Sequence, residues 1–217
     1  MGLYYREKFT NGQEIAVWEI TEPEEELADR CKAAGHLPGF YRQTTSKQRR
    51  LERMAVRLLL DTLQGPRVIL HYKENGQPFL HSSLSAVSIA HTRRFVCLLT
   101  APGKQAGIDI ECMTRNFEAV EKKALHPAEK PDLIRCARQS GAPDQIRCAL
   151  WCAKEAVYKY MGQEGVDFAS QIIVSPFIPG DEGVSQAVFI EKNGNQIRLP
   201  LSYKRLEDHL MVWIVPE

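Results

Sequence analysis

Two long amphipathic segments, each accompanied by short β-prone runs, most constrain the fold of this 217-residue chain. Residues 46–64 place apolar side chains at helical spacing, which predicts a buried stripe of Leu51, Met54, Ala55, Leu58 and Thr62. Residues 143–161 repeat the pattern, and glycines end both segments. The β-prone runs are 68–72, 77–80, 87–90, 95–100, 106–111, 172–175, 187–191, 197–203 and 210–215.

Pro102-Gly103 interrupts this pattern and divides it into two halves, each with one main helix and several strands. We therefore predict an α+β protein with two similar halves, residues 1–103 and 104–217. Hydrophobic residues make up 44% of the chain and charged residues 25%, a composition that excludes a disordered chain.

No apolar stretch approaches the roughly 20 residues that cross a bilayer, and no apolar leader opens the sequence. We expect a cytoplasmic protein without a membrane span. Its six cysteines form no C-x-x-C pair and no cysteine–histidine spacing typical of zinc sites, which predicts reduced thiols. The net charge of +1 gives no general attraction to nucleic acid.

A local concentration of positive charge covers residues 42–57, which hold six basic side chains and one acid, Glu52. Arg50, Arg53 and Arg57 share one helix face. Such a face is either solvated or an anion site for phosphates, and this segment alone favours the solvated face.

Two acids stand two residues apart in the predicted strand 106–111, at Asp109 and Glu111. Because side chains alternate along a strand, both carboxylates share one face, which we expect to be exposed, while Ile108 and Ile110 take the other. Neighbouring carboxylates repel unless a cation lies between them, and such an oxygen-lined site suits Mg²⁺. Taken alone, the pair is more typical of an ordinary exposed strand face.

The helix 143–161 carries Glu155 and Lys159 off its apolar stripe, with Lys154 beside them. The i, i+4 spacing fits a surface ion pair, or a metal ligand or base beside a phosphate-binding lysine. His91 follows a β-prone run and precedes Arg93 and Arg94, so it either caps a turn or binds an anion.

These segments together resemble the 4′-phosphopantetheinyl transferase superfamily. The resemblance rests on Gly-Ile-Asp-Ile-Glu at 107–111 and Trp-Cys-Ala-Lys-Glu-Ala-Val-Tyr-Lys at 151–159. Asn-Gly-Gln-Pro at 75–78 resembles the family's Gly-Lys-Pro turn, and Ser-Ile-Ala-His-Thr at 88–92 resembles its Asn-(Ile/Leu)-Ser-His-Ser. The length resembles that of the monomeric, surfactin-synthetase-activating (Sfp-like) type.

The resemblance implies that Asp109, Glu111 and Glu155 hold Mg²⁺ against the pyrophosphate of coenzyme A. Glu155, directly or through a water, would deprotonate a carrier-protein serine, and Lys159 would neutralise the departing 3′,5′-ADP. Lys154 would contact phosphate.

Arg57 and His91 would bind the nucleotide end of coenzyme A, including its 3′-phosphate. Three departures from the family pattern occur there: Gln77 replaces its lysine, Ala90 its serine, and Thr92-Arg93 the Ser-Gly that follows its histidine. Arg93 or Arg94 is the expected replacement for the missing charge.

The resemblance further implies a pseudo-dimer of two halves with the active site between them. The nucleotide end would bind to the first half, and the metal and catalytic residues would lie in the second. The expected activity is transfer of 4′-phosphopantetheine from coenzyme A to an acyl or peptidyl carrier protein, in fatty acid, polyketide or nonribosomal peptide biosynthesis. The alternatives are a degenerate member that binds coenzyme A or a carrier without catalysis, and a nucleic-acid-binding module built on residues 42–57.

Overall fold

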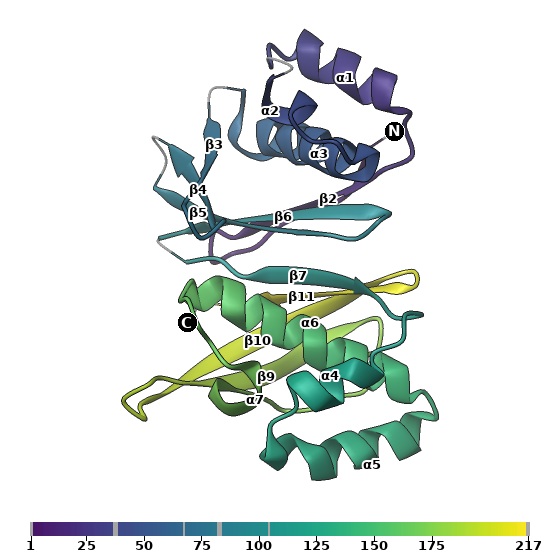
Figure 1. Cartoon of the computed structure of the whole chain (residues 1–217), viewed down its shortest axis with the longest axis vertical. Coiled ribbons are helices and arrows are strands. Elements are labelled where there is room, and N and C mark those ends of the chain that lie inside the picture. Colours follow the sequence, from purple (N-terminus) through teal and green to yellow (C-terminus); the bar gives the residue numbers. More distant parts are fainter. Residues whose placement is uncertain (1, 37–38, 67, 82–83, 104, 216–217) are drawn as a thin grey trace. The chain divides into compact units, whose positions relative to one another are not determined.

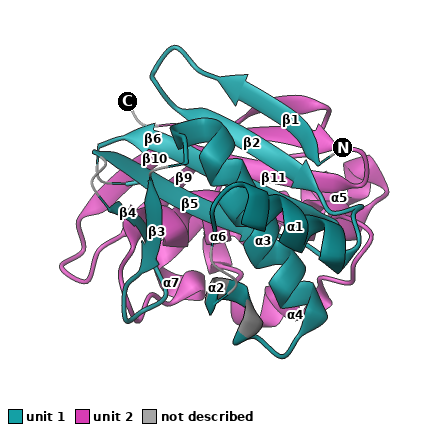
Figure 2. Ribbon diagram, turned by 90° about the horizontal axis from the view of Figure 1, so that it is seen from above, with its two compact units in different colours: residues 1–106 teal, residues 107–217 magenta. Residues whose placement is uncertain are grey.

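The computed structural model describes residues 2–36, 39–66, 68–81, 84–103 and 105–215. It divides the chain into two compact units, residues 1–106 and 107–217 (Figure 2). The sequence pattern placed this division at residues 103 and 104, and Lys104 lies outside the described residues. The side chains of Phe40 and Arg42 also lie outside them.

Unit 1 combines an antiparallel four-stranded sheet, of order β1-β2-β6-β5, with a separate β3-β4 hairpin and three helices. Helix α3 packs on strands β2 and β6, and α1 lies beside α3 (Figure 2). The elements are β1 Leu3–Lys8, β2 Glu14–Glu19, α1 Glu24–Ala33, α2 Gly39–Arg42, α3 Lys47–Gln64, β3 Ile69–Tyr72, β4 Pro78–His81, β5 Ser85–His91 and β6 Phe95–Pro102.

Helix α3 confirms the predicted helix over residues 46–64. Ser46 caps its N-terminus by accepting a hydrogen bond from the Arg49 amide, and Gly65 ends it with a positive φ of 82°. Four of the five predicted stripe residues are buried in the core of unit 1. Thr62 is exposed, a correction to that stripe, and its hydroxyl donates to the Leu58 carbonyl.

Strands β1 and β2 were not predicted from the sequence. Strand β1 is largely exposed, whereas β2 is buried between β1 and β6 and carries Ile15, Val17 and Trp18 into the interior. The apolar run of β2 is only residues 15–18, and it lies between two acids, Glu14 and Glu19. Because glutamate is depleted in strands, these acids weaken the strand pattern in the sequence.

Unit 2 has an antiparallel five-stranded sheet of order β7-β11-β10-β9-β8 (Figure 1). Its elements are β7 Ile108–Cys112, α4 Glu118–Lys123, the 3-10 turn η1 Pro127–Glu129, α5 Lys130–Ser140, α6 Pro143–Met161, α7 Phe168–Gln171, β8 Ile172–Val174, β9 Glu182–Ile190, β10 Gln196–Leu206 and β11 His209–Ile214.

Helix α6 begins and ends where the sequence predicts. Pro143 occupies its first turn, and Gly162 closes it in the left-handed conformation with a φ of 59°. The helix packs on β7 and β11, so the core of unit 2 forms between α6 and the sheet. No helix in the described part of the chain is long and apolar enough to cross a membrane.

Candidate active site

The candidate site depends on a close approach between β7 and α6, which Gly107 permits. A Cβ at this position would collide with the Ala156 carbonyl oxygen and would lie 2.7 Å from the Tyr160 Cβ. The Gly107 carbonyl also accepts a 3.0 Å hydrogen bond from the Ile214 amide of β11. A glycine is required here because the backbone of β7 enters directly against the helix.

This approach brings Lys159 of α6 onto Asp109 of β7. The Lys159 ammonium donates to Asp109 Oδ1 at 2.7 Å and to the Ile108 carbonyl at 3.1 Å. Asp109 is only 7% exposed, so the expectation that its carboxylate lies on an exposed strand face is wrong. Helix α6 covers that face.

The second oxygen of Asp109, Oδ2, is buried and has no hydrogen-bond partner in the described structure. A buried carboxylate oxygen without a partner is unfavourable, and native proteins rarely leave one without an ion or a water. This orphaned oxygen is the feature that best fits the binding of a cation.

Glu111 lies two residues along β7 and is already engaged through both oxygens. Its Oε1 accepts from the Trp151 indole at 3.2 Å, and its Oε2 pairs with Arg115 at 2.5 Å. Burial and the Asp109 charge raise the pKa of Glu111, and Arg115 opposes them. The strand thus carries two acids whose charges act on each other.

Glu155 lies one turn before Lys159 on α6 and is half-buried. Burial, followed by the charge of Asp109, raises its pKa from 4.5 to about 7. Its carboxylate makes no hydrogen bond to any described residue. A carboxyl group that titrates near neutral pH in a charged site is suited to act as a general base.

The donor set of Asp109, Glu111 and Glu155 fits a hard divalent cation, because it offers only carboxylate oxygens. The three side chains do not converge in this structure: they are absent from the described groups whose ligand atoms lie within 4.8 Å of one another. Lys159 and Arg115 hold two of them and supply the compensating positive charge.

Lys154 does not contact phosphate from its observed position, which corrects the expectation for it. The side chain is fully buried, and its ammonium pairs with Glu129 at 2.9 Å. It also donates to the carbonyls of Phe168 and Ile172. Because a lysine ammonium has three donors, these contacts use them all, and Lys154 joins α6 to η1 and β8.

His91 lies at the end of β5 against the basic helix α3. Its Nε2 is 2.7 Å from Arg49 Nη1, and its Nδ1 is 3.4 Å from the buried carboxylate of Glu52. These three side chains, together with Arg53, line a cleft of about 630 Å³ in unit 1. The same cleft is lined by Thr44, Val56, Tyr72, Gly76, Pro78 and Ile89.

The other expected coenzyme A contacts do not line this cleft. Arg57 is half-buried one turn further along α3, and Arg53 and Arg49 occupy the cleft instead. Gln77 stands between the cleft residues Gly76 and Pro78, and its side-chain oxygen accepts a 2.8 Å hydrogen bond from Lys73.

Arg93 is exposed, and its backbone carbonyl accepts from the Gln48 side-chain amide at 3.0 Å. Arg94 pairs with Glu19 at 2.6 Å, stacks over Phe95 and does not line the cleft. The family resemblance did not point to Lys73, because this lysine lies before the Asn-Gly-Gln-Pro turn at 75–78 on which the resemblance partly rests.

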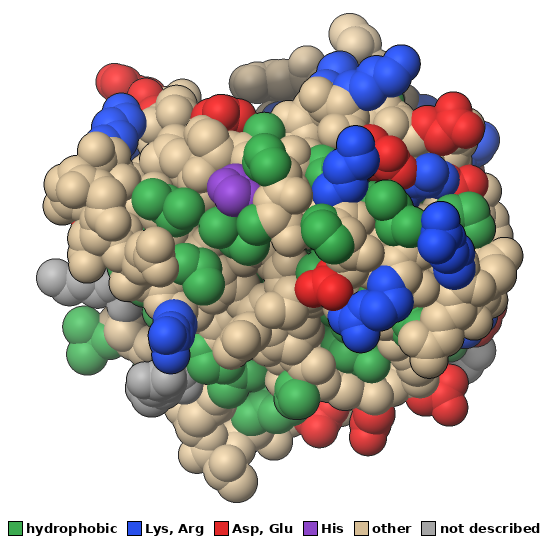
Figure 3. Space-filling view, turned by 90° about the horizontal axis from the view of Figure 1, so that it is seen from below, with side chains coloured by type: hydrophobic (Ala, Val, Ile, Leu, Met, Phe, Trp, Pro, Cys, Tyr) green, Lys and Arg blue, Asp and Glu red, His purple; other side chains and the backbone are tan. Residues whose placement is uncertain are grey.

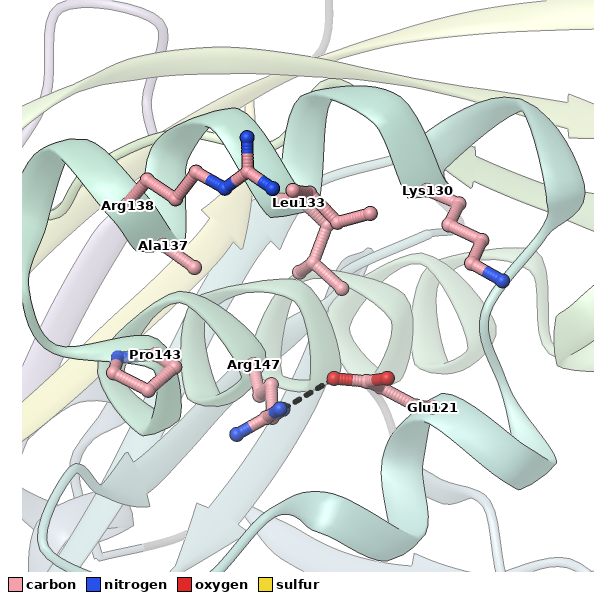
Figure 4. A pocket seen from close by; sticks show the side chains of 8 residues that line it. Glu121, Lys130, Leu133, Ala137, Arg138, Pro143 and Arg147 are labelled. Carbon is pink, nitrogen blue, oxygen red and sulfur yellow. Dashed lines mark hydrogen bonds and ion pairs between the residues drawn. The ribbon is translucent and has the colours of Figure 1, made fainter.

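A second hollow, of about 330 Å³, lies among α4, α5 and the start of α6 (Figure 4). Leu133, Ala137 and Pro143 form its apolar part, and Arg147 crosses it to pair with Glu121 at 2.6 Å. None of the predicted site residues lines it.

Residues 105–208 match the family model of the 4′-phosphopantetheinyl transferase superfamily. The match covers just under half of the chain and includes Asp109, Glu111, Glu155 and Lys159, with no part of the cleft around His91. It supports a phosphopantetheine transferase activity in general, with coenzyme A and a carrier protein as the implied partners. A search of curated proteins found no match.

Proposed function

We propose that this protein transfers 4′-phosphopantetheine from coenzyme A to a serine of an apo acyl or peptidyl carrier protein and releases 3′,5′-ADP. The observation that carries the proposal is the placement of Glu155 one helical turn from the Asp109–Lys159 pair. The raised pKa of Glu155 supports a role as base. All three residues lie within the segment that matches the superfamily.

Asp109, Glu111 and Glu155 would together hold Mg²⁺, consistent with the orphaned Asp109 Oδ2. A bound Mg²⁺ supplies charge neutralisation and orients phosphate oxygens. Glu155 takes the proton of the carrier serine, whose hydroxyl oxygen then forms a bond to the β-phosphorus as the bond to 3′,5′-ADP breaks. Lys159 offsets the negative charge that develops on the leaving group.

The cleft in unit 1 supports a role in binding the nucleotide end of coenzyme A. Arg49, Arg53 and His91 supply positive charge and hydrogen-bond donors, and Val56 and Ile89 supply an apolar wall. That both units contribute to one active site, as in the Sfp-like type, stays a prediction of the family resemblance. A monomeric, cytoplasmic enzyme is proposed on the same basis.

The direct test is mass spectrometry of purified apo carrier proteins incubated with coenzyme A and Mg²⁺. A mass increase of one phosphopantetheine on the carrier serine supports the proposal. A serine-to-alanine carrier is the matched control for the modified position. If no carrier in a panel of fatty acid, polyketide and peptide carriers gains this mass, the proposal is wrong.

A separate binding experiment tests the unit 1 cleft. Calorimetry compares coenzyme A with 3′-dephospho-coenzyme A, which lacks the phosphate that the cleft arginines would hold. Arg53→Ala should weaken binding of the first ligand more than that of the second. Arg94→Ala is the matched control, because Arg94 pairs with Glu19 and does not line the cleft. Equal affinities in Arg53→Ala and the wild type would remove the cleft from the proposal.

A catalytically degenerate member of the same family is the alternative, because Gln77 and Ala90 remove a charge and a hydroxyl. Such a protein would bind coenzyme A in calorimetry without modifying any carrier. The intact set of Asp109, Glu111, Glu155 and Lys159 favours the enzyme.

A nucleic-acid-binding module is the less favoured alternative. The basic helix α3 has part of its charge paired, through Arg50 with Glu24 and Arg49 with Glu52. Figure 3 shows basic, acidic and apolar side chains interspersed on the face that it draws, which is not the face on which Figure 2 shows α3. Nucleic-acid-binding domains usually concentrate basic charge on one face.

A further inference from the structure

A second cluster of side chains that can bind a metal ion lies where the end of β7 meets the turn between β10 and β11. Cys112, the last residue of β7, is the register partner of His209, the first residue of β11. Asp208 precedes His209 in the turn. One ligand atom from each of these three residues lies within 4.8 Å of the other two.

Each oxygen of the Asp208 carboxylate lies near one of the other two residues. Cys112 Sγ lies 3.6 Å from Asp208 Oδ2, and His209 Nδ1 lies 2.8 Å from Asp208 Oδ1. Zinc bonds of about 2.3 Å to sulfur and about 2.1 Å to oxygen, at a tetrahedral angle, put those two ligand atoms about 3.6 Å apart. The observed sulfur–oxygen separation therefore matches one edge of a zinc tetrahedron.

The backbone fixes the turn that presents Asp208. Leu206 pairs with His209, so Glu207 and Asp208 form a two-residue hairpin turn. Glu207 has a φ of 55°, a value that favours glycine, and the Arg205 side chain donates to its carbonyl at 2.8 Å. The Met113 amide also donates to the Asp208 carbonyl at 2.8 Å, which ties the turn to the residue after Cys112.

We propose that Cys112, Asp208 and His209 form a binding site for a borderline-soft divalent cation, with Zn²⁺ as the best match. Thiolate, imidazole and carboxylate are the ligands that zinc takes in proteins, whereas Mg²⁺ requires oxygen ligands. Three protein ligands leave the fourth position to a water or an exogenous ligand.

The three ligand residues differ in exposure, so the site faces solvent on one side. His209 is 4% exposed and Cys112 is half-buried, whereas the Asp208 side chain is 46% exposed. An ion would enter past Asp208 and reach Cys112 and His209 at the end of the paired strands β7 and β11. The Thr114 hydroxyl lies 3.1 Å from Cys112 Sγ, within reach to donate to a thiolate.

Binding releases the Cys112 thiol proton to solvent, since the thiolate is the ligand. A proton on His209 Nδ1 that bridges to Asp208 is displaced to Nε2 or to solvent when the ion binds Nδ1. A bound ion then joins the end of β7 to the β10–β11 turn, so we expect it to raise the melting temperature of the protein.

The test uses the full chain, without an affinity tag and stripped of metal with EDTA. Titration with Co²⁺ should produce the ultraviolet charge-transfer absorption of a cobalt–thiolate bond at one ion per chain. Excess Zn²⁺ should abolish the absorption, and a large excess of Mg²⁺ should leave it. Zn²⁺ affinity is measured by calorimetry.

Cys112→Ser should remove the charge-transfer band, and Asp208→Asn should weaken Zn²⁺ binding at least about tenfold, since even outer partners of a metal change affinity about 10–100-fold. Cys136→Ser controls for another thiol, and Asp29→Asn for another exposed acid. His81→Ala controls for the exposed pair of His71 and His81, whose rings lie 5.6 Å apart. These three controls should bind as the wild type does.

Each ligand variant is checked for an unchanged circular dichroism spectrum before titration. Absence of the thiolate band in the wild type would overturn the proposal. So would equal Zn²⁺ affinity in Cys112→Ser and the wild type, or displacement of Co²⁺ by Mg²⁺ at comparable concentration.

Discussion

The Lys159 ammonium lies 2.7 Å from Asp109 Oδ1, while Oδ2 of the same carboxylate is buried without a hydrogen-bond partner in the described structure. Lysine therefore neutralises one side of an aspartate whose other side is available to a second cation. This arrangement allows the acidic cluster to fold without a bound cation, because some positive charge is already in place.

Replacing Lys159 with Ala should destabilise the metal-free protein by about 1–3 kcal/mol, because both Asp109 oxygens would then be buried without partners. Mg²⁺ should recover part of the loss. Thermal unfolding with and without Mg²⁺ measures both effects, and Lys192→Ala, at an exposed position in the β9–β10 turn, serves as the control. An unchanged melting temperature for Lys159→Ala would place the ammonium in solvent.

Asp109→Ala should abolish carrier modification and remove the stabilisation by Mg²⁺. The loss of a buried charge beside Glu111 and Glu155 relieves repulsion, yet it also leaves Lys159 without its partner, so we expect only a small change in metal-free stability. Mass spectrometry and thermal unfolding measure the two effects. Turnover at the wild-type rate would exclude Asp109 from the site.

Glu155→Gln should lower the rate of transfer about 10²–10⁴-fold, the range for general acid–base groups, while the fold is kept. If Glu155 only formed a surface ion pair, its replacement would not change the rate measurably. Initial rates at saturating coenzyme A decide between the two, with the exposed Glu164→Gln as the matched control. A rate within threefold of the wild type for Glu155→Gln would favour the surface pair.

The stability of the metal-free protein should fall as the pH rises from about 4.5 to about 7, because burial and Asp109 raise the pKa of Glu155 to about 7 in the folded state. In this range the folded protein binds more protons than the unfolded chain, so raising the pH favours unfolding. Mg²⁺ should therefore raise the melting temperature more at pH 8 than at pH 5.

The comparison of wild type with Glu155→Gln isolates this effect, since glutamine does not titrate. The difference in melting temperature between the two should grow with pH in the absence of Mg²⁺. A constant difference across this pH range would show that Glu155 has an ordinary pKa.

Lys154→Met should destabilise the protein by about 3–5 kcal/mol, the effect of leaving a buried acid, Glu129, without its partner. The double variant with Glu129→Gln should lose less than the two single variants combined, because no uncompensated charge remains. Denaturant unfolding gives these values. A phosphate-binding lysine would instead leave stability unchanged and weaken coenzyme A binding.

Local sequence was sufficient for the features that depend on neighbouring residues. Gly65 marks the end of α3, and Pro143 and Gly162 mark the ends of α6. Helical spacing placed Glu155 and Lys159 on one face. Strand alternation placed Asp109 and Glu111 on one face, and the order and spacing of the segments 107–111 and 151–159 carried the family resemblance.

The tertiary structure decided which groups each of these side chains meets. Lys154 adjoins Glu155 in sequence, yet its partner is Glu129, which a different element supplies. Asp109 is buried because α6 crosses β7, and nothing in the strand itself encodes that cover. Cys112 and His209 are far apart in the chain, and only the pairing of β7 with β11 brings them together. Periodicity and capping act over a few residues, whereas burial, ion pairing and metal-ligand geometry depend on which distant segments pack against each other.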